Sequence, residues 1–295
     1  MPRSFRRPSH AGSWYESSAS TLADQIQAWT EEASVVPDVH ARAIIAPHAG
    51  YSYCGHVMAF AYKQIDPAKV SRVFLLGPSH HVHTEKCVLS RADSYRTPLG
   101  DMEIDMEIYS ELKNTGMFET MDMDVDEAEH SLELHTPYIV HTLRGQPFKL
   151  VPIMVGSLST RSEAEYGRIL GPYLNDSSNL FVVSSDFCHW GTRFRYTLYD
   201  EQWGPIWKYI EWLDHEGMKA IETGDARNFK QYLRKTDNTI CGRHPISVFM
   251  NMLDFCDGKF KIDFTKYDQS SHCRNPSDSS VSYASAIVQE VAGPQ

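Results

Sequence analysis

The chain has 295 residues, of which 42% are hydrophobic and 12% aromatic, and this is enough apolar material for a sizeable core. Its formal net charge of -10 disfavours contact with a phosphate backbone, so we expect no nucleic-acid partner. No apolar stretch approaches the roughly 20 residues that cross a bilayer, so we expect no membrane insertion.

The pattern of apolar residues predicts alternating helices and strands. Leu22, Ile26 and Trp29 share one face of a first helix, which ends before Pro37. Strands are then expected at 43–46, 73–76, 88–89, 148–155, 180–185, 259–265 and 281–291, and helices at 54–65, 104–115, 161–174, 199–222, 226–234 and 245–255. Such alternation predicts one α/β domain over residues 1–295, with a central, mostly parallel sheet flanked by helices. The last two strands are expected to add an antiparallel pair at an edge.

Three of the apolar runs end at a loop that carries histidine. Residues 43–46 lead to Pro47-His48, residues 73–76 to Gly77-Pro78-Ser79-His80-His81, and residues 180–185 to Asp186-Phe187-Cys188-His189. Short continuous apolar runs are typical of strands buried on both faces, and the loops after parallel strands converge on one crevice. The sequence therefore predicts a metal or proton-transfer site at that crevice.

Each of these loops also allows a simpler interpretation. His48 lies in a rigid turn after Pro47, which suits a ligand, but a histidine can also pack at a strand end. Adjacent side chains alternate in direction, so only one of His80 and His81 is expected to face the crevice. Asp186 and His189 can support a metal or form a surface ion pair. Ser184-Ser185 lacks a G-x-S-x-G elbow, which argues against a serine hydrolase.

Two further polar segments carry candidate chemistry. Residues 129–135 include His130, which suits acid/base catalysis, although the segment can equally be the solvated entry to a helix kinked at Pro137. Cys241 precedes a helix and Arg243, a setting that should lower the thiol pKa and favour metal ligation or redox chemistry. The alternative for Cys241 is a small buried hydrophobe. Six scattered cysteines without a CxxC pair fit a reducing, cytoplasmic setting.

Six motifs in order along nearly the whole chain resemble the MEMO family, the mediators of receptor-driven cell motility, and most closely its eukaryotic branch. The motifs are His10-Ala11-Gly12-Ser13-Trp14-Tyr15, Ile44-Ile45-Ala46-Pro47-His48-Ala49-Gly50-Tyr51, Leu76-Gly77-Pro78-Ser79-His80-His81, Glu129-His130-Ser131, Ser184-Ser185-Asp186-Phe187-Cys188-His189-Trp190-Gly191 and Asn238-Thr239-Ile240-Cys241-Gly242-Arg243-His244-Pro245.

This resemblance implies the fold of the class III extradiol dioxygenases, which hold iron(II) with two histidines and a glutamate. It places His48 and His80 at the histidine positions and Cys241 at the third, where a thiolate suits one copper or iron ion. The lost carboxylate argues against ring cleavage, and the resemblance leads us to expect a metal-dependent oxidoreductase that generates superoxide or peroxide. His130, Asp186 and His189 are then catalytic residues that tune the metal or move protons.

The resemblance also implies a role in receptor tyrosine kinase signalling to the cytoskeleton and cell motility, in the cytoplasm and also the nucleus. The expected partners are signalling proteins and phosphorylated receptor-tail peptides. The residues assigned to peptide binding by position are Trp14, Tyr53, Asp186, His189 and Arg193. The alternative function is a non-enzymatic adaptor that binds phosphotyrosine peptides in a vestigial dioxygenase-like cleft.

Overall fold

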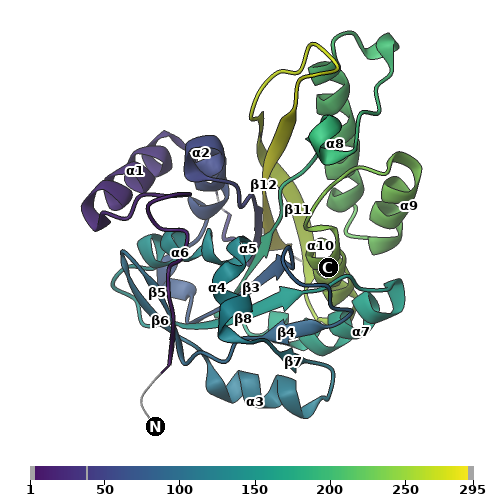
Figure 1. Cartoon of the computed structure of the whole chain (residues 1–295). Coiled ribbons are helices and arrows are strands. Elements are labelled where there is room, and N and C mark those ends of the chain that lie inside the picture. The colour runs from purple at the N-terminus through teal and green to yellow at the C-terminus, as the bar shows by residue number, and fades with distance from the viewer. Residues whose placement is uncertain (1–3, 38, 292–295) are drawn as a thin grey trace.

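A large mixed sheet forms the centre of the protein in a computed structural model that describes residues 4–37 and 39–291 (Figure 1). Its nine strands follow the order β10-β12-β2-β9-β3-β8-β4-β7, with β11 paired to β12. Their bounds are β2 Ala43–Ala46, β3 Arg72–Pro78, β4 Cys87–Leu89, β7 Glu119–Thr120, β8 Lys149–Val155, β9 Asn179–Ser184, β10 His189–Trp190, β11 Lys259–Gln269 and β12 Ser280–Val291.

The four middle strands β2, β9, β3 and β8 are parallel to one another. Their residues are almost all buried, because helices and loops cover both faces of a parallel sheet. Ala46 lies opposite Ser184, and Leu76 lies opposite Val183. The loops that follow β2, β9 and β3 therefore leave the sheet at the same edge, as the sequence predicts.

The late strands form the predicted antiparallel addition. β12 pairs antiparallel with both β2 and β11, so β11 is an outer strand. Figure 1 shows these two strands extending beyond the rest of the sheet beside helix α8 (Ile206–Glu222). A separate three-stranded sheet contains β1 (Phe5–Arg6), β5 (Ser94–Thr97) and β6 (Gly100–Glu103), none of which the sequence predicts.

The α-helices include the expected ones, with shifted ends, and three short ones between residues 123 and 142 that lie outside the expected ranges. Besides α8 they are α1 Ala19–Glu32, α2 Tyr51–Tyr62, α3 Met106–Asn114, α4 Met123–Ala128, α5 His130–Glu133, α6 Thr136–Thr142, α7 Thr160–Leu170, α9 Ala226–Thr236 and α10 Arg243–Met252. The expected start of α8 at residue 199 is wrong. Gly204 has a φ of 83° and Pro205 caps the helix, so Trp203 belongs to a preceding 3-10 turn.

Several helices pack directly on the sheet and bring the site loops together. α2 contacts β2 and β12, α5 contacts β3 and β8, and α10 contacts β3 and β9. Short 3-10 helices occur at Pro67–Lys69, Gly171–Asn175, Thr192–Phe194, Glu201–Trp203 and Leu253–Phe255. In the part of the chain that the structure describes, no helix is both long and apolar enough to cross a membrane.

Candidate metal centre

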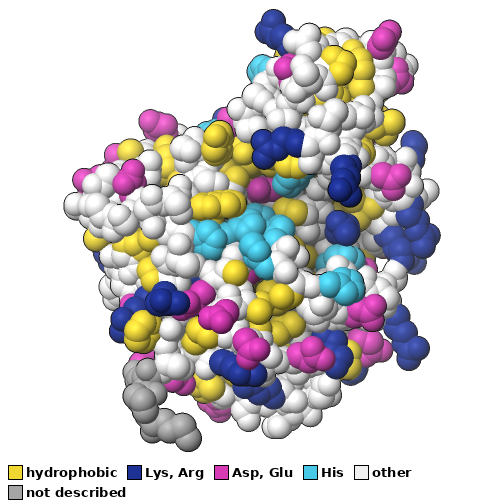
Figure 2. Space-filling model, viewed as in Figure 1, with side chains coloured by type: hydrophobic (Ala, Val, Ile, Leu, Met, Phe, Trp, Pro, Cys, Tyr) yellow, Lys and Arg dark blue, Asp and Glu magenta, His cyan; other side chains and the backbone are white. Residues whose placement is uncertain are grey.

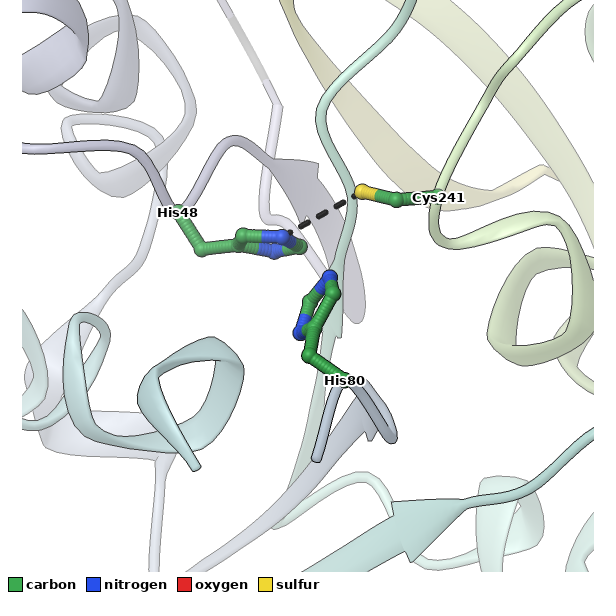
Figure 3. Close-up of side chains that lie close together, drawn as sticks. All are labelled: His48, His80 and Cys241. Atoms are coloured by element: carbon green, nitrogen blue, oxygen red, sulfur yellow. Dashed lines mark hydrogen bonds between the residues drawn. The ribbon is translucent and has the colours of Figure 1, made fainter. Parts of the chain in front are cut away.

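Three side chains from separate parts of the sequence converge at the edge where the parallel strands end (Figure 3). His48 follows β2, His80 follows β3, and Cys241 directly precedes α10. One ligand atom from each lies within 4.8 Å of the other two, and the Cys241 Sγ is 3.2 Å from the His48 Nε2. The loops at the ends of parallel strands predict this convergence for His48 and for one of His80 and His81. The choice of His80 and the inclusion of Cys241 come from the family resemblance.

The His48 ring is held in one orientation by Ser184. The Ser184 hydroxyl donates to the main-chain oxygen of Ser131 at 2.7 Å, so it accepts from the His48 Nδ1–H at 2.6 Å. This leaves the lone pair of Nε2 directed at Cys241. Burial, followed by the nearby His80 and His130, lowers the pKa of His48 and keeps its imidazole neutral. A neutral imidazole with a fixed tautomer is ready to bind a metal.

His80 is oriented in the same way by a carboxylate. Glu129 accepts from the His80 Nδ1 at 2.9 Å, from the His80 main-chain N–H at 2.6 Å and from the Ser131 N–H at 2.8 Å. Burial alone would raise the pKa of Glu129, but its bond to His80 and the nearby histidines lower it to about 2. Burial lowers the pKa of His80, but its bonds to Cys241 and Glu129 raise it to about 10. A carboxylate that receives the Nδ1–H leaves the His80 Nε2 as the atom that can bind a metal, once it has lost its proton.

Cys241 is positioned by a close approach of two loops. A Cβ at Gly242 would lie 2.3 Å from the Ser185 Cβ and 2.5 Å from the Ser184 oxygen, so only glycine fits beside the β9 loop. The thiol sulfur also accepts from the Asp186 N–H at 3.3 Å. The expected lowering of the thiol pKa is wrong: burial raises it, while Arg243 is exposed.

Asp186 and His189 lie beside this centre without forming the surface ion pair that the sequence allows. The Asp186 side chain is buried, and its carboxylate accepts from the His48 N–H at 2.8 Å. Burial raises the pKa of this carboxyl to about 7. His189 donates from Nδ1 to the Phe187 oxygen at 2.9 Å, and its main-chain N–H bonds the Thr239 hydroxyl. Asp186 therefore positions the His48 loop directly.

His130 lies on the outer side of the centre. Its ring stacks on His80 with centroids 4.3 Å apart and lies 4.5 Å from the Trp14 ring. The alternative of a solvated entry to a kinked helix is wrong, because the segment contains two helices: α5 ends at Glu133, and Pro137 lies in the first turn of α6.

A model of the family described as Memo-like protein matches residues 6–287. The chain belongs to the Memo family. It is 53% identical over 288 residues to Protein MEMO1 of Danio rerio, covering 96% of this chain and 97% of that protein. The identity to Protein MEMO1 of Homo sapiens is 52% over 288 residues, with the same coverage.

More distant relatives are also similar. The Protein memo-1 homolog of Caenorhabditis elegans is 44% identical over 289 residues, covering 96% of this chain and 82% of that protein. Among solved structures, an uncharacterized protein from Escherichia coli K12 has a TM-score of 0.48 and 12% identity, over 84% of this chain and 99% of that one. The family resemblance predicted from the six motifs is thus confirmed by the sequence relatives.

The residues predicted for peptide binding divide into two groups in this Memo-family chain. Trp14, Tyr53 and Arg193 line a pocket of about 420 Å³, together with serines of the β11–β12 hairpin. Asp186 and His189 are not among its lining residues. Arg193 lies over the Phe194 ring at 4.6 Å, and no ion pair links it to Asp186 within the described residues.

The sequence alone does not identify the residues that support the centre. In the sequence, Ser184 stands out only as a nucleophile that the missing G-x-S-x-G elbow argues against, and Glu129 only as a neighbour of His130. Nothing in the sequence singles out the buried Arg6, yet it pairs with Asp126 and Glu133. No sequence spacing signals these contacts, because the partners of Ser184 and Arg6 are more than 50 positions away.

We expect Ser184→Ala to weaken metal binding while the protein stays folded. The change removes the acceptor that fixes the Nδ1–H tautomer of His48, and loss of such a supporting contact typically costs about 10–100-fold in metal affinity. Competition titration with a copper(I) chelator measures the affinity. Ser285→Ala is the matched control, since its buried hydroxyl bonds the Val57 oxygen, in the α2 region. Equal affinity in both variants would contradict the proposed role of Ser184.

Proposed function

We propose that this Memo-family chain is a metal-binding redox protein that holds one copper or iron ion with His48, His80 and Cys241. The observation that carries the proposal is the arrangement of the ligand atoms, which lie within 4.8 Å of one another with both imidazole Nδ1 atoms already bonded elsewhere. Two imidazoles and one thiolate suit copper(I) and iron(II). The donor set thus fits the ion that the resemblance implies.

Each residue around the centre has a distinct part in this proposal. When bound, the ion supplies one-electron exchange with dioxygen, which yields superoxide or peroxide when a cellular reductant provides the electrons. Ser184 and Glu129 hold the two ligand imidazoles, and Asp186 fixes the His48 backbone. Cys241 must lose its thiol proton to become a ligand, so metal uptake releases a proton. His130 and Trp14 pack against each other beside the centre, with ring centroids 4.5 Å apart.

The redox proposal predicts peroxide release that depends on the centre. With ascorbate as reductant and air as the source of dioxygen, copper-loaded wild type freed of unbound copper by gel filtration is expected to release peroxide. His48→Ala treated in the same way is expected to release it at least tenfold more slowly. A fluorometric peroxide assay measures the rate, and free copper at the same concentration is the control. Repeated turnover of catechols to ring-opened products by the iron-loaded protein would contradict the proposal and restore the dioxygenase function.

The second candidate function is an adaptor that binds phosphotyrosine peptides. The observation that favours it is the pocket lined by Trp14, Tyr53 and Arg193, which combines aromatic rings with a guanidinium. The guanidinium of Arg193 can donate two parallel hydrogen bonds to a phosphate, and the aromatic rings can pack against a tyrosine side chain. We propose that this pocket serves receptor tyrosine kinase signalling to the cytoskeleton and cell motility, in the cytoplasm and nucleus, with phosphorylated receptor tails and signalling proteins as partners.

Arg193→Ala is expected to abolish the preference for a phosphorylated peptide. The net charge of -10 repels a phosphopeptide at long range, so its affinity must come from local groups such as Arg193. Calorimetry with a tyrosine peptide of a receptor tail and its phosphorylated form should show at least tenfold tighter binding of the latter to wild type only. Arg274→Ala, an exposed arginine of the same hairpin, is the control. Equal affinities for both peptides on wild type would eliminate a phosphate-specific site.

A further inference from the structure

A second group of side chains that can bind a metal lies beside the candidate centre. His80, Glu129 and His130 each offer a ligand atom that is within 4.8 Å of the other two. His80 follows β3, Glu129 caps α5, and His130 is the first residue of that helix. Figure 2 shows histidine side chains gathered in a hollow over the region where β3 and α5 lie in Figure 1. The second group therefore lies where an ion can reach it from solvent.

The distances around the Glu129 carboxylate are close to those of atoms that share one ion. A metal bonded at about 2.1 Å to a nitrogen and to an oxygen holds these two atoms roughly 3.0–3.4 Å apart at tetrahedral or octahedral angles. The Glu129 Oε1 lies 2.9 Å from the His80 Nδ1 and 3.7 Å from the His130 Nδ1, on either side of that range. Main-chain N–H groups of His80 and Ser131 hold the carboxylate in place. Small shifts of the two rings are enough to seat an ion.

The His130 ring makes no hydrogen bond within the part of the chain that the structure describes. Its side chain is only 15% exposed, and its Nδ1 is too far from Glu129 for a hydrogen bond. Polar side chains that are this well covered usually have a partner, so the free nitrogen calls for an explanation. Burial, followed by the nearby His80, lowers the pKa of His130 to about 3 and keeps the imidazole neutral. An ion beside Glu129 supplies the missing partner.

The His80 ring can serve both groups, because its two nitrogens point in opposite directions. Figure 3 shows one nitrogen directed toward His48 and Cys241 and the other directed away from them. The second is the Nδ1 that bonds Glu129. Burial lowers the pKa of His80, but its bonds to Cys241 and Glu129 raise it to about 10, so the metal-free ring holds both protons. An ion at Nδ1 releases one proton to the buffer, and an ion at Nε2 releases the other.

We propose that His80, Glu129 and His130 hold a zinc(II) ion, with the His80 ring as the bridge to the neighbouring centre. Two imidazoles and one carboxylate suit zinc(II), whereas the thiolate of Cys241 makes the neighbouring set softer. Three protein ligands leave a fourth position for water. The two sites share only His80, so zinc(II) binds here whether or not the copper or iron centre is filled.

Zinc(II) binding to metal-free Cys241→Ser tests the site, because this change removes the sulfur of the neighbouring centre. Competition with a coloured zinc chelator measures the affinity. Adding His130→Phe, which keeps a ring between Trp14 and His80, is expected to weaken zinc(II) binding at least tenfold. Adding Glu129→Gln, which keeps the size of the side chain but removes its charge, is expected to do the same. Two separate substitutions keep the test decisive if one of them unfolds the protein.

His48→Ala in the same Cys241→Ser protein is the matched control. The His48 ring is also a neighbour of His80, with centroids 5.2 Å apart, and its loss should change the zinc(II) affinity less than threefold. Equal losses in His48→Ala and His130→Phe would place the ion in the inner centre and overturn the proposal. Unchanged affinity in both His130→Phe and Glu129→Gln would also overturn it. So would a Cys241→Ser protein that binds no zinc(II), whereas the copper or iron centre is judged separately by copper(I) binding to wild type.

Discussion

Cys241→Ser is expected to lose copper(I) affinity by more than the roughly 100-fold that removal of a supporting contact costs. The sulfur lies 3.2 Å from the His48 Nε2, and it is the only soft ligand among the three. Serine has nearly the same shape, but its hydroxyl oxygen is hard and does not ionise at neutral pH, so it binds copper(I) poorly. Chelator competition under anaerobic conditions measures the change.

A second cysteine controls for unspecific thiol chemistry. Cys256 is half-buried near the end of α10, and its thiol donates to the Leu253 oxygen. Cys256→Ser should bind copper(I) as wild type does. If Cys241→Ser retained the wild-type affinity, the thiolate would not be a ligand. His48 and His80 would then have to bind the ion with another partner.

Arg6→Met is expected to destabilise the fold by about 3–5 kcal/mol, the usual cost of removing one partner of a buried ion pair. Arg6 is 1% exposed and bonds Asp126 at 3.1 Å and Glu133 at 2.7 Å, both of which are buried. Methionine fills part of the volume but leaves two carboxylates without their cation. The substitution should also disturb the orientation of His10, because its Nδ1 bonds Glu133. Urea denaturation followed by circular dichroism measures the free energy of unfolding.

The neighbouring arginine provides a matched control. Arg7 pairs with Glu127, but its side chain is 70% exposed. Solvent screens such a pair, and we expect Arg7→Met to change the free energy of unfolding by about 1 kcal/mol or less. A similar cost for the two variants would contradict the account of Arg6 as the cation of a buried network.

The parallel core of the sheet was predictable from the sequence, while the N-terminal segment was not. The runs 43–46, 73–76 and 180–185 are apolar except for Ser184 and Ser185, so the positions of the strands follow from them. The burial of Arg6 has no signal in the sequence, because its carboxylate partners are 120 or more residues away. Charge pairing across that distance leaves no periodic signal in the sequence.

The site residues also divide into those that the sequence predicts and those that only the structure reveals. His48 was predicted from its place at a strand end, and His80 was chosen over His81 through the family resemblance. The sequence also predicts a lowered pKa for Cys241, and the structure reverses that direction. Nearness to a helix start is visible in the sequence, whereas the burial that raises the thiol pKa depends on how the β9 loop and Gly242 pack. The support that Ser184 gives His48 likewise appears only when β2 and β9 lie side by side.

X-ray absorption spectroscopy of the copper(I)-loaded protein tests the central claim most directly, because it reports which elements bond the ion. The account predicts one sulfur and two imidazole nitrogens in wild type, and loss of the sulfur contribution in Cys241→Ser. Protein should be purified without chelating resin and loaded with one equivalent of copper. A wild-type spectrum with nitrogen and oxygen neighbours only would contradict a centre built from His48, His80 and Cys241.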